Sequence, residues 1–144
     1  MKKSGFGLIM LSLALIIFSS CAKTDTTAAA PTTTSGIIVQ SNWTLTYFSD
    51  NGNDHTADYN GFKFLFSAGG SVAAYNTLLS VNGAWSTYND DSRDNLLLTF
   101  PNTLAVIAAL NHDWHIIEKT TVKLRMQDLS GGPGVTSYLT LEKN

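Results

Sequence analysis

Short runs in which large apolar side chains stand at every second position follow one another from Trp43 to the end of this 144-residue chain. Trp43–Phe48 and Phe62–Ser67 are the clearest, and the second has three alternating phenylalanines. A period of two puts such side chains on one face of a half-buried strand, so we expect Trp43, Leu45 and Tyr47 to point the same way. Weaker runs of this kind lie at 72–80, 81–88, 96–100, 115–119, 121–127 and 135–142.

Turn signals separate these runs. Gly69-Gly70 indicates a hairpin after the phenylalanine-rich run, and Ser130–Gly134 is a glycine-rich turn or loop. Gly83, inside a run, indicates a point where another backbone or ring approaches closely. Thr103–Leu110 is apolar without alternation, which allows one or two turns of helix or an irregular loop. Strands at intervals of roughly 8–12 residues favour an antiparallel sandwich or barrel.

The N-terminal segment has the pattern of an export leader. Lys2 and Lys3 precede the uncharged run Leu8–Phe18, which is shorter than the about 20 apolar residues of a membrane-spanning helix. Phe18-Ser19-Ser20-Cys21 resembles the lipobox of bacterial lipoproteins, in which the cysteine is acylated and the chain is cut before it. Because Cys21 is the one cysteine of an exported chain, acylation explains it better than a disulfide. We predict a signal peptide at 1–20 and a membrane anchor at Cys21; the alternative is an ordinary secretory signal.

The remainder divides into a stalk and a folded domain. Residues 21–36 are dominated by Thr, Ala and Ser, so they cannot bury enough apolar surface to become ordered, and we predict a flexible linker. Ile37–Asn144 has the size of one ordinary domain. Without Lys2 and Lys3 the nine basic residues fall to seven against eleven acidic ones, which gives a net charge of −4. This charge argues against nucleic acid as a partner.

A set of aromatic and glycine positions carries a family resemblance. The set comprises Trp43-Thr44-Leu45, the phenylalanine-rich run closing on Gly69-Gly70, the Gly83-x-Trp85 pair, and Trp114 leading into Lys123-Leu124-Arg125. Together they resemble the small lipocalin-like lipoproteins of Gram-negative envelopes, over roughly Ser41–Asn144. The resemblance implies an all-β fold, an antiparallel up-and-down eight-stranded barrel with at most one short helix, that binds small hydrophobic or amphipathic molecules. It also implies a lipid-anchored protein of the cell envelope, at the outer membrane and facing the periplasm or the surface.

The interior of such a barrel decides the function, because eight strands leave room that side chains just fill or that holds one small ligand. The candidate ligand-binding residues are Trp43, Tyr47, Phe64, Phe66, Trp85 and Trp114. Loops Ser49–Tyr59 and Asn102–Trp114 would then orient the ligand at the mouth of the barrel. The alternative is that the same rings form a filled core. The protein would then be a non-enzymatic module that docks another envelope protein or a surface polymer.

The polar motifs are weaker. His112-x-x-His115 has the spacing of a zinc site on a helix, but positions three apart in a strand face opposite ways, so we favour two solvated loop histidines. Asp50–Asp54 resembles the start of a calcium loop, yet His55 and Gly61 stand where glycine and glutamate are needed, which favours a simple turn. No serine lies in a Gly-x-Ser-x-Gly turn. We therefore predict no metal, no cofactor and no enzyme activity.

Overall fold

The protein was studied as a computed structural model, which describes residues 32–130 and 136–144. Over these residues nine strands form one antiparallel sheet. The strands are β1 Asn42–Asp50, β2 Asn53–Asp54, β3 Lys63–Phe66, β4 Ser71–Tyr75, β5 Ser80–Asp90, β6 Arg93–Thr99, β7 Asp113–Lys119, β8 Lys123–Asp128 and β9 Ser137–Lys143. Four predictions lie wholly or mostly outside the described residues: the signal peptide, the anchor at Cys21, the linker 21–36 and the glycine-rich turn Ser130–Gly134.

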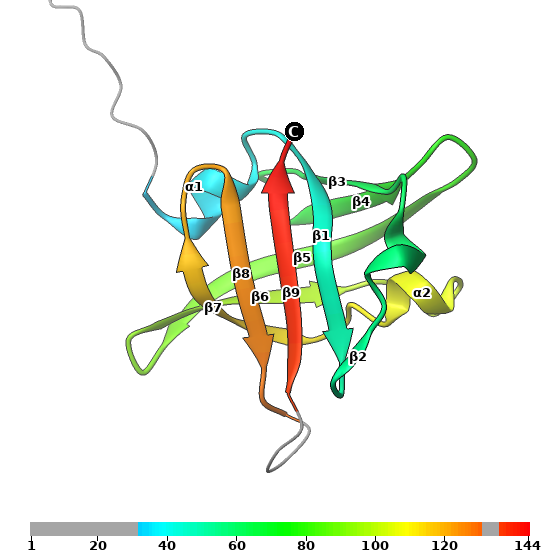
Figure 1. Ribbon diagram of the computed structural model, residues 1–144. Coiled ribbons are helices and arrows are strands. Elements are labelled where there is room, and N and C mark those ends of the chain that lie inside the picture. The colour runs from blue at the N-terminus through cyan, green and yellow to red at the C-terminus, as the bar shows by residue number, and fades with distance from the viewer. Residues whose placement is uncertain (1–31, 131–135) are drawn as a thin grey trace, which may run out of the picture.

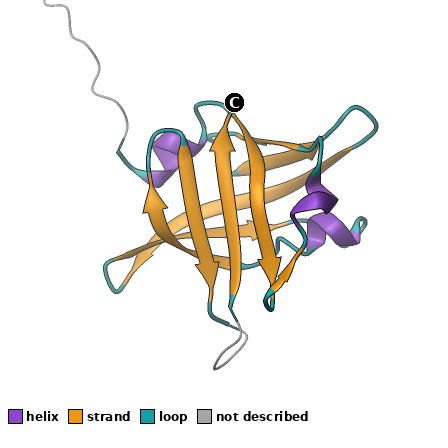
Figure 2. Ribbon diagram, in the orientation of Figure 1, coloured by secondary structure: helices purple, strands orange, loops and turns teal. Residues whose placement is uncertain are grey.

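The sheet closes into a barrel (Figures 1 and 2). From β3 to β9 each strand pairs with the next along the chain, β1 pairs with β3 on one side, and β1 pairs with β9 on the other. The two residues of β2 are appended to the end of β1, so the wall itself has eight strands. The prediction of an antiparallel up-and-down eight-stranded barrel is therefore confirmed.

Two details of the strands differ from the sequence prediction. The expected run 72–80 is broken, because the Asn76 side chain accepts hydrogen bonds from the backbone N–H groups of Leu78 and Leu79 and makes a turn between β4 and β5. In β1 the register with β9 shifts between Leu45 and Tyr47. This bulge turns Tyr47 outward, where it is 41% exposed, and places Phe48 inside at 1%. The prediction that Tyr47 faces the interior was wrong.

Short helices close or border the barrel ends. They are α1 Thr34–Ile38, α2 Ala105–Ala108 and the 3-10 helix η1 Thr56–Tyr59, so there are two short α-helices in the described chain and not one. α2 falls inside the apolar segment Thr103–Leu110, where the sequence allowed either a helical turn or an irregular loop. α1 begins two residues before the end of the expected linker, because Thr33 caps it through the Gly36 N–H. Across the described residues, none of the helices has the length and apolar character needed to cross a bilayer.

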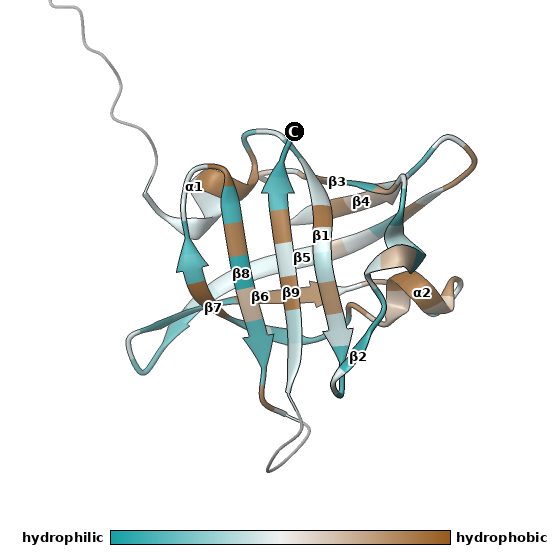
Figure 3. Cartoon of the chain, in the orientation of Figure 1, coloured by the Kyte–Doolittle hydropathy of each residue, from teal (hydrophilic) through white to brown (hydrophobic). Residues whose placement is uncertain are grey.

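The core fills the inner face of the barrel. Along β8 and β9 apolar and polar residues alternate, as Figure 3 shows, and the leucines and Met126 are buried. Gly83 lies where the ring of Phe100 crosses β5, and a Cβ atom there would stand 2.5 Å from the Thr99 carbonyl oxygen and 2.6 Å from Phe100 Cδ1. The close approach expected at Gly83 is thus confirmed.

Candidate functional site

The two ends of the barrel are built differently. At the end where the described chain begins, which we call the closed end, α1 packs with Ile37 and Ile38 fully inside. The indole N–H of Trp43 donates to the Ile38 carbonyl oxygen at 2.7 Å and so attaches this helix to β1. The closed end therefore has an apolar plug held by a buried hydrogen bond.

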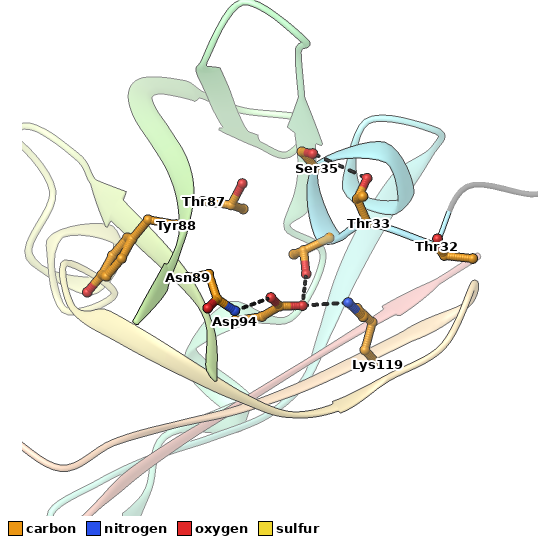
Figure 4. Close-up of a pocket in the computed structure, with 9 residues that line it drawn as sticks. Thr32, Thr33, Ser35, Thr87, Tyr88, Asn89, Asp94 and Lys119 are labelled. Atoms are coloured by element: carbon orange, nitrogen blue, oxygen red, sulfur yellow. Dashed lines mark hydrogen bonds and ion pairs between the residues drawn. The ribbon is translucent and has the colours of Figure 1, made fainter. Parts of the chain in front are cut away.

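A polar pocket of about 350 Å3 lies beside this plug (Figure 4). Its centre is Asp94, whose carboxylate accepts hydrogen bonds from Thr34 Oγ1 at 3.3 Å, Asn89 Nδ2 at 3.2 Å and Lys119 Nζ at 2.5 Å. The hydrogen bonds from Lys119 and Asn89 lower the pKa of Asp94. These groups satisfy one another's hydrogen-bonding capacity and join α1 to β5, β6 and β7. We therefore interpret the pocket as a structural connection between these elements.

At the opposite end of β1 the wall is incomplete. β1 has nine residues, but β3 has four and pairs only with Asn42 and Trp43 at the start of β1. The segment before η1 takes over: the His55 N–H donates to the Phe48 carbonyl oxygen at 2.9 Å, and Thr56 Oγ1 accepts from the Phe48 N–H at 2.9 Å. The segment from β2 into η1 thus takes the place of β3 beside the second half of β1.

The loop between β6 and β7 approaches this segment. Asn111 holds the base of the loop, since its Nδ2 donates to the Phe100 carbonyl oxygen at 2.8 Å and its Oδ1 accepts from the Phe100 N–H. The Tyr59 hydroxyl donates to the Val106 carbonyl oxygen at 2.6 Å and so links η1 to α2. Burial, with a further contribution from the charges of Asp58 and Asp50, raises the pKa of Tyr59, which keeps its hydroxyl protonated as a donor.

An open cleft of about 510 Å3 lies between η1 and α2, and we call it the end cleft. It is lined by Phe48, Asp50, His55, Asp58, Tyr59, Ala105, Val106 and Ala109. The buried rings of Phe48 and Tyr59 and the half-buried Val106 make an apolar floor. The more exposed rim carries two carboxylates, an imidazole and the two alanines. Phe48 meets the Tyr59 ring edge to face at 5.4 Å between centroids. This is the combination of apolar surface and few polar groups that small-molecule sites have.

The predicted ligand-binding residues lie elsewhere. Five of them are buried in the core, namely Trp43, Phe64, Phe66, Trp85 and Trp114, and Tyr47 is on the outer surface. Within the described chain none of the five lines the pockets at either end. Trp114 meets Phe48, a residue of the cleft floor, edge to face at 6.3 Å between ring centroids. At these positions the structure favours the filled-core alternative.

The two loops named from the sequence do meet at the end cleft. Sequence reasoning nevertheless missed Phe48 as part of its floor, because strict alternation placed Phe48 on the polar face of its strand. The adjacent aromatics Tyr47 and Phe48 carried a signal, since two neighbouring rings in one strand cannot both face inward unless a bulge intervenes. The contribution of Ala105, Val106 and Ala109 depends on a loop position that no local pattern reveals.

The polar motifs do not assemble into a metal site in the described residues, where no three His, Cys, Asp or Glu side chains gather for one. His112 Nδ1 pairs with the buried Asp128 at 2.5 Å, while His115 pairs with Asn95. The two histidines thus have different partners, and neither is simply solvated. Asp54 Oδ1 accepts from the Thr56 N–H at 2.8 Å, as in an ordinary Asx turn.

No protein-family model matches this chain, and no curated protein matches it in sequence. Its fold is similar to the crystal structure of a DUF4847 family protein from Bacteroides vulgatus ATCC 8482, determined at 1.00 Å resolution. The TM-score is 0.52 at 16% sequence identity, and the match covers 75% of this chain and 95% of the other. At this identity the similarity shows the fold alone, and it fits a lipocalin-like barrel.

Proposed function

We propose that this protein binds a small amphipathic molecule in the end cleft, as a lipid-anchored, lipocalin-like protein of the bacterial envelope. The observation that carries the proposal is the end cleft itself, with its apolar floor under a polar rim. Its volume of about 510 Å3 falls in the range of roughly 300–1,000 Å3 found for ligand pockets. The proposal moves the ligand from the interior to the end of the barrel, because the predicted aromatics are core.

The framing of the end cleft supports a preformed site. The Tyr59 to Val106 hydrogen bond joins its two sides, and the paired hydrogen bonds between Phe100 and Asn111 fix the loop that carries α2. A site whose walls are already held in place loses less conformational entropy when a ligand binds. This lower cost supports the binding of a small molecule with a modest contact area.

The envelope location rests on the leader and on the resemblance. Cys21 lies before the described residues, and the described chain enters the barrel at the closed end through α1 (Figure 1). An anchor at Cys21 would therefore be joined to the barrel at its closed end. Metabolic labelling with a fatty acid tests this: the wild-type chain should incorporate label in the membrane fraction, whereas Cys21→Ala should not. A label that persists in Cys21→Ala would contradict the anchor.

The ligand proposal is tested on the lipid-free mature chain, residues 22–144, by native mass spectrometry and by uptake of a hydrophobic fluorescent probe. Ala109 is exposed and lines the end cleft, so Ala109→Trp fills it. Ala68→Trp is the matched control, because Ala68 is exposed in the turn between β3 and β4. We expect Ala109→Trp to lose probe binding and Ala68→Trp to keep it. Equal binding by both variants, or none by the wild type, would contradict the proposal.

One observation favours the docking alternative. Leu78 is 88% exposed at the tip of the hairpin between β4 and β5, which projects from the barrel in Figure 1. A leucine held in solvent by the Asn76 turn is available to a partner surface. A photo-crosslinking residue at position 78 in intact cells should then give one defined adduct, and a crosslinker at exposed Ala68 should not.

A further inference from the structure

The rim of the end cleft is acidic whatever the protonation of its histidine. It carries the carboxylates of Asp50 and Asp58 against the single imidazole of His55, and no lysine or arginine of the described chain lines the cleft. Two negative groups outnumber one group that can be positive. The rim therefore keeps a net negative charge even when His55 is protonated.

We infer that the end cleft selects cationic amphipaths, molecules in which a protonated amine is attached to an apolar body. This inference rests on the proposed function and names the class of its ligand. The apolar body would lie on the floor, against Phe48, Tyr59 and Val106. The ammonium group would lie at the rim, where it can donate charge-assisted hydrogen bonds to the carboxylates of Asp50 and Asp58.

The positions of the two acids suit this role. Asp50 ends β1, and its Oδ1 accepts a hydrogen bond from Ser137 Oγ at 2.8 Å, which fixes the carboxylate at the edge of the barrel. Asp58 lies in η1, and its Oδ2 is 3.3 Å from Nδ1 of His55. Burial raises the pKa of Tyr59 in the floor, and the negative charges of Asp58 and Asp50 raise it further. An anionic ligand would meet repulsion from the same groups.

The apolar floor also separates an organic cation from a bare metal ion. A divalent ion needs several oxygen or nitrogen ligands around one point, and the described residues bring no three such side chains together. A cleft of about 510 Å3 would leave a metal ion with aromatic and aliphatic neighbours that cannot coordinate it. Aromatic faces, in contrast, attract an ammonium group as well as its hydrocarbon.

The test uses three ligands with one apolar body: decylamine, decanol and decanoate, titrated below their micelle concentrations into the lipid-free mature chain. A hydrogen bond to a charged group contributes about 1.5–3 kcal/mol, so decylamine should bind at least about 10-fold more tightly than decanol. Decanoate should bind most weakly. In Asp50→Asn/Asp58→Asn the preference for the amine should disappear, while decanol affinity stays the same.

Two further variants keep the test specific. Asp90→Asn/Asp91→Asn removes the same charge at the exposed turn between β5 and β6 and should preserve the amine preference. Asp58→Asn alone changes an exposed side chain and should reduce the preference in part, which guards against misfolding of the double variant.

The results separate the proposed function, which is ligand binding in the end cleft, from the inferred selectivity for amines. Equal binding of the three ligands, blocked by Ala109→Trp, would keep the end cleft as a ligand site and overturn the charge selectivity. Equal loss of amine binding in both double variants would also overturn it, because general surface charge would then explain the preference. Failure of all three ligands to bind would overturn the proposed function together with this inference.

Discussion

The closed end and the end cleft solve the same structural problem in different ways. At each end an aromatic side chain donates a hydrogen bond to the backbone carbonyl of a short helix: Trp43 of β1 to Ile38 of α1 at one end, and Tyr59 of η1 to Val106 of α2 at the other. At the closed end, however, Asp94 is neutralised by Lys119 and apolar side chains plug the opening. At the end cleft no lysine or arginine of the described residues lines the site, and the floor is open. The contrast separates a structural end from a binding end.

Removal of the Trp43 side chain, which holds the apolar plug, should cause the largest loss of stability. Trp43→Ala removes a fully buried indole and its hydrogen bond to α1, so we expect a loss of about 3–5 kcal/mol in the free energy of unfolding, measured by urea denaturation. The fraction that remains folded should keep its affinity for decylamine, because the end cleft lies at the other end of β1. A parallel fall in affinity would show that the two ends are coupled.

Addition of a methyl group at Gly83, between the two ends, should cause the next largest loss of stability. In Gly83→Ala the new Cβ would overlap the Thr99 carbonyl oxygen and the Phe100 ring, which costs about 1–3 kcal/mol. Because Phe100 also anchors the loop of α2, ligand affinity should fall as well. Gly69→Ala is the matched control, since no atom lies within 4 Å of a Cβ there, and its stability should be nearly unchanged. Equal stability of the two variants would contradict the close packing at Gly83.

The sequence predicted the barrel but not the location of the cleft, and the reason is physical. Alternation and turn residues such as Gly69-Gly70 are local signals, and eight short strands in succession leave few architectures to choose from. The bulge beside Tyr47 depends on register with a strand at the far end of the chain. The Tyr59 to Val106 bond joins residues 47 positions apart. The hydrogen bond has no local pattern, and the bulge has only the adjacent rings of Tyr47 and Phe48 as a signal, so the candidates named from the sequence include core aromatics that do not line the end cleft.

Removal of the Tyr59 hydroxyl tests whether its hydrogen bond organises the end cleft. Tyr59→Phe keeps the ring and deletes the donor to the Val106 carbonyl oxygen, so we expect a loss of about 1 kcal/mol in stability. The frame of the end cleft should loosen, and decylamine affinity should fall by a few-fold. Tyr47→Phe, at an exposed outer position, should change neither quantity. A Tyr59→Phe protein with unchanged affinity would show that this hydrogen bond does not organise the cleft.

The smallest effect is expected from Asp94 at the closed end, and it has a defined pH dependence. The hydrogen bonds from Lys119 and Asn89 lower the pKa of Asp94 in the folded state relative to the unfolded value of about 3.9. The charged carboxylate therefore stabilises the fold above about pH 4, and this contribution is lost as the pH falls through the lower, folded pKa. Because the ion pair is partly exposed, Asp94→Asn should cost less than about 1 kcal/mol at pH 7. Urea denaturation of both proteins should show this difference shrinking as the pH is lowered from 5 towards 2.

Ligand affinity at pH 7 should stay the same, since Asp94 belongs to the closed end. A stability difference that does not depend on pH would show that the carboxylate charge does not stabilise this end, and a change in affinity would break the separation of the two ends.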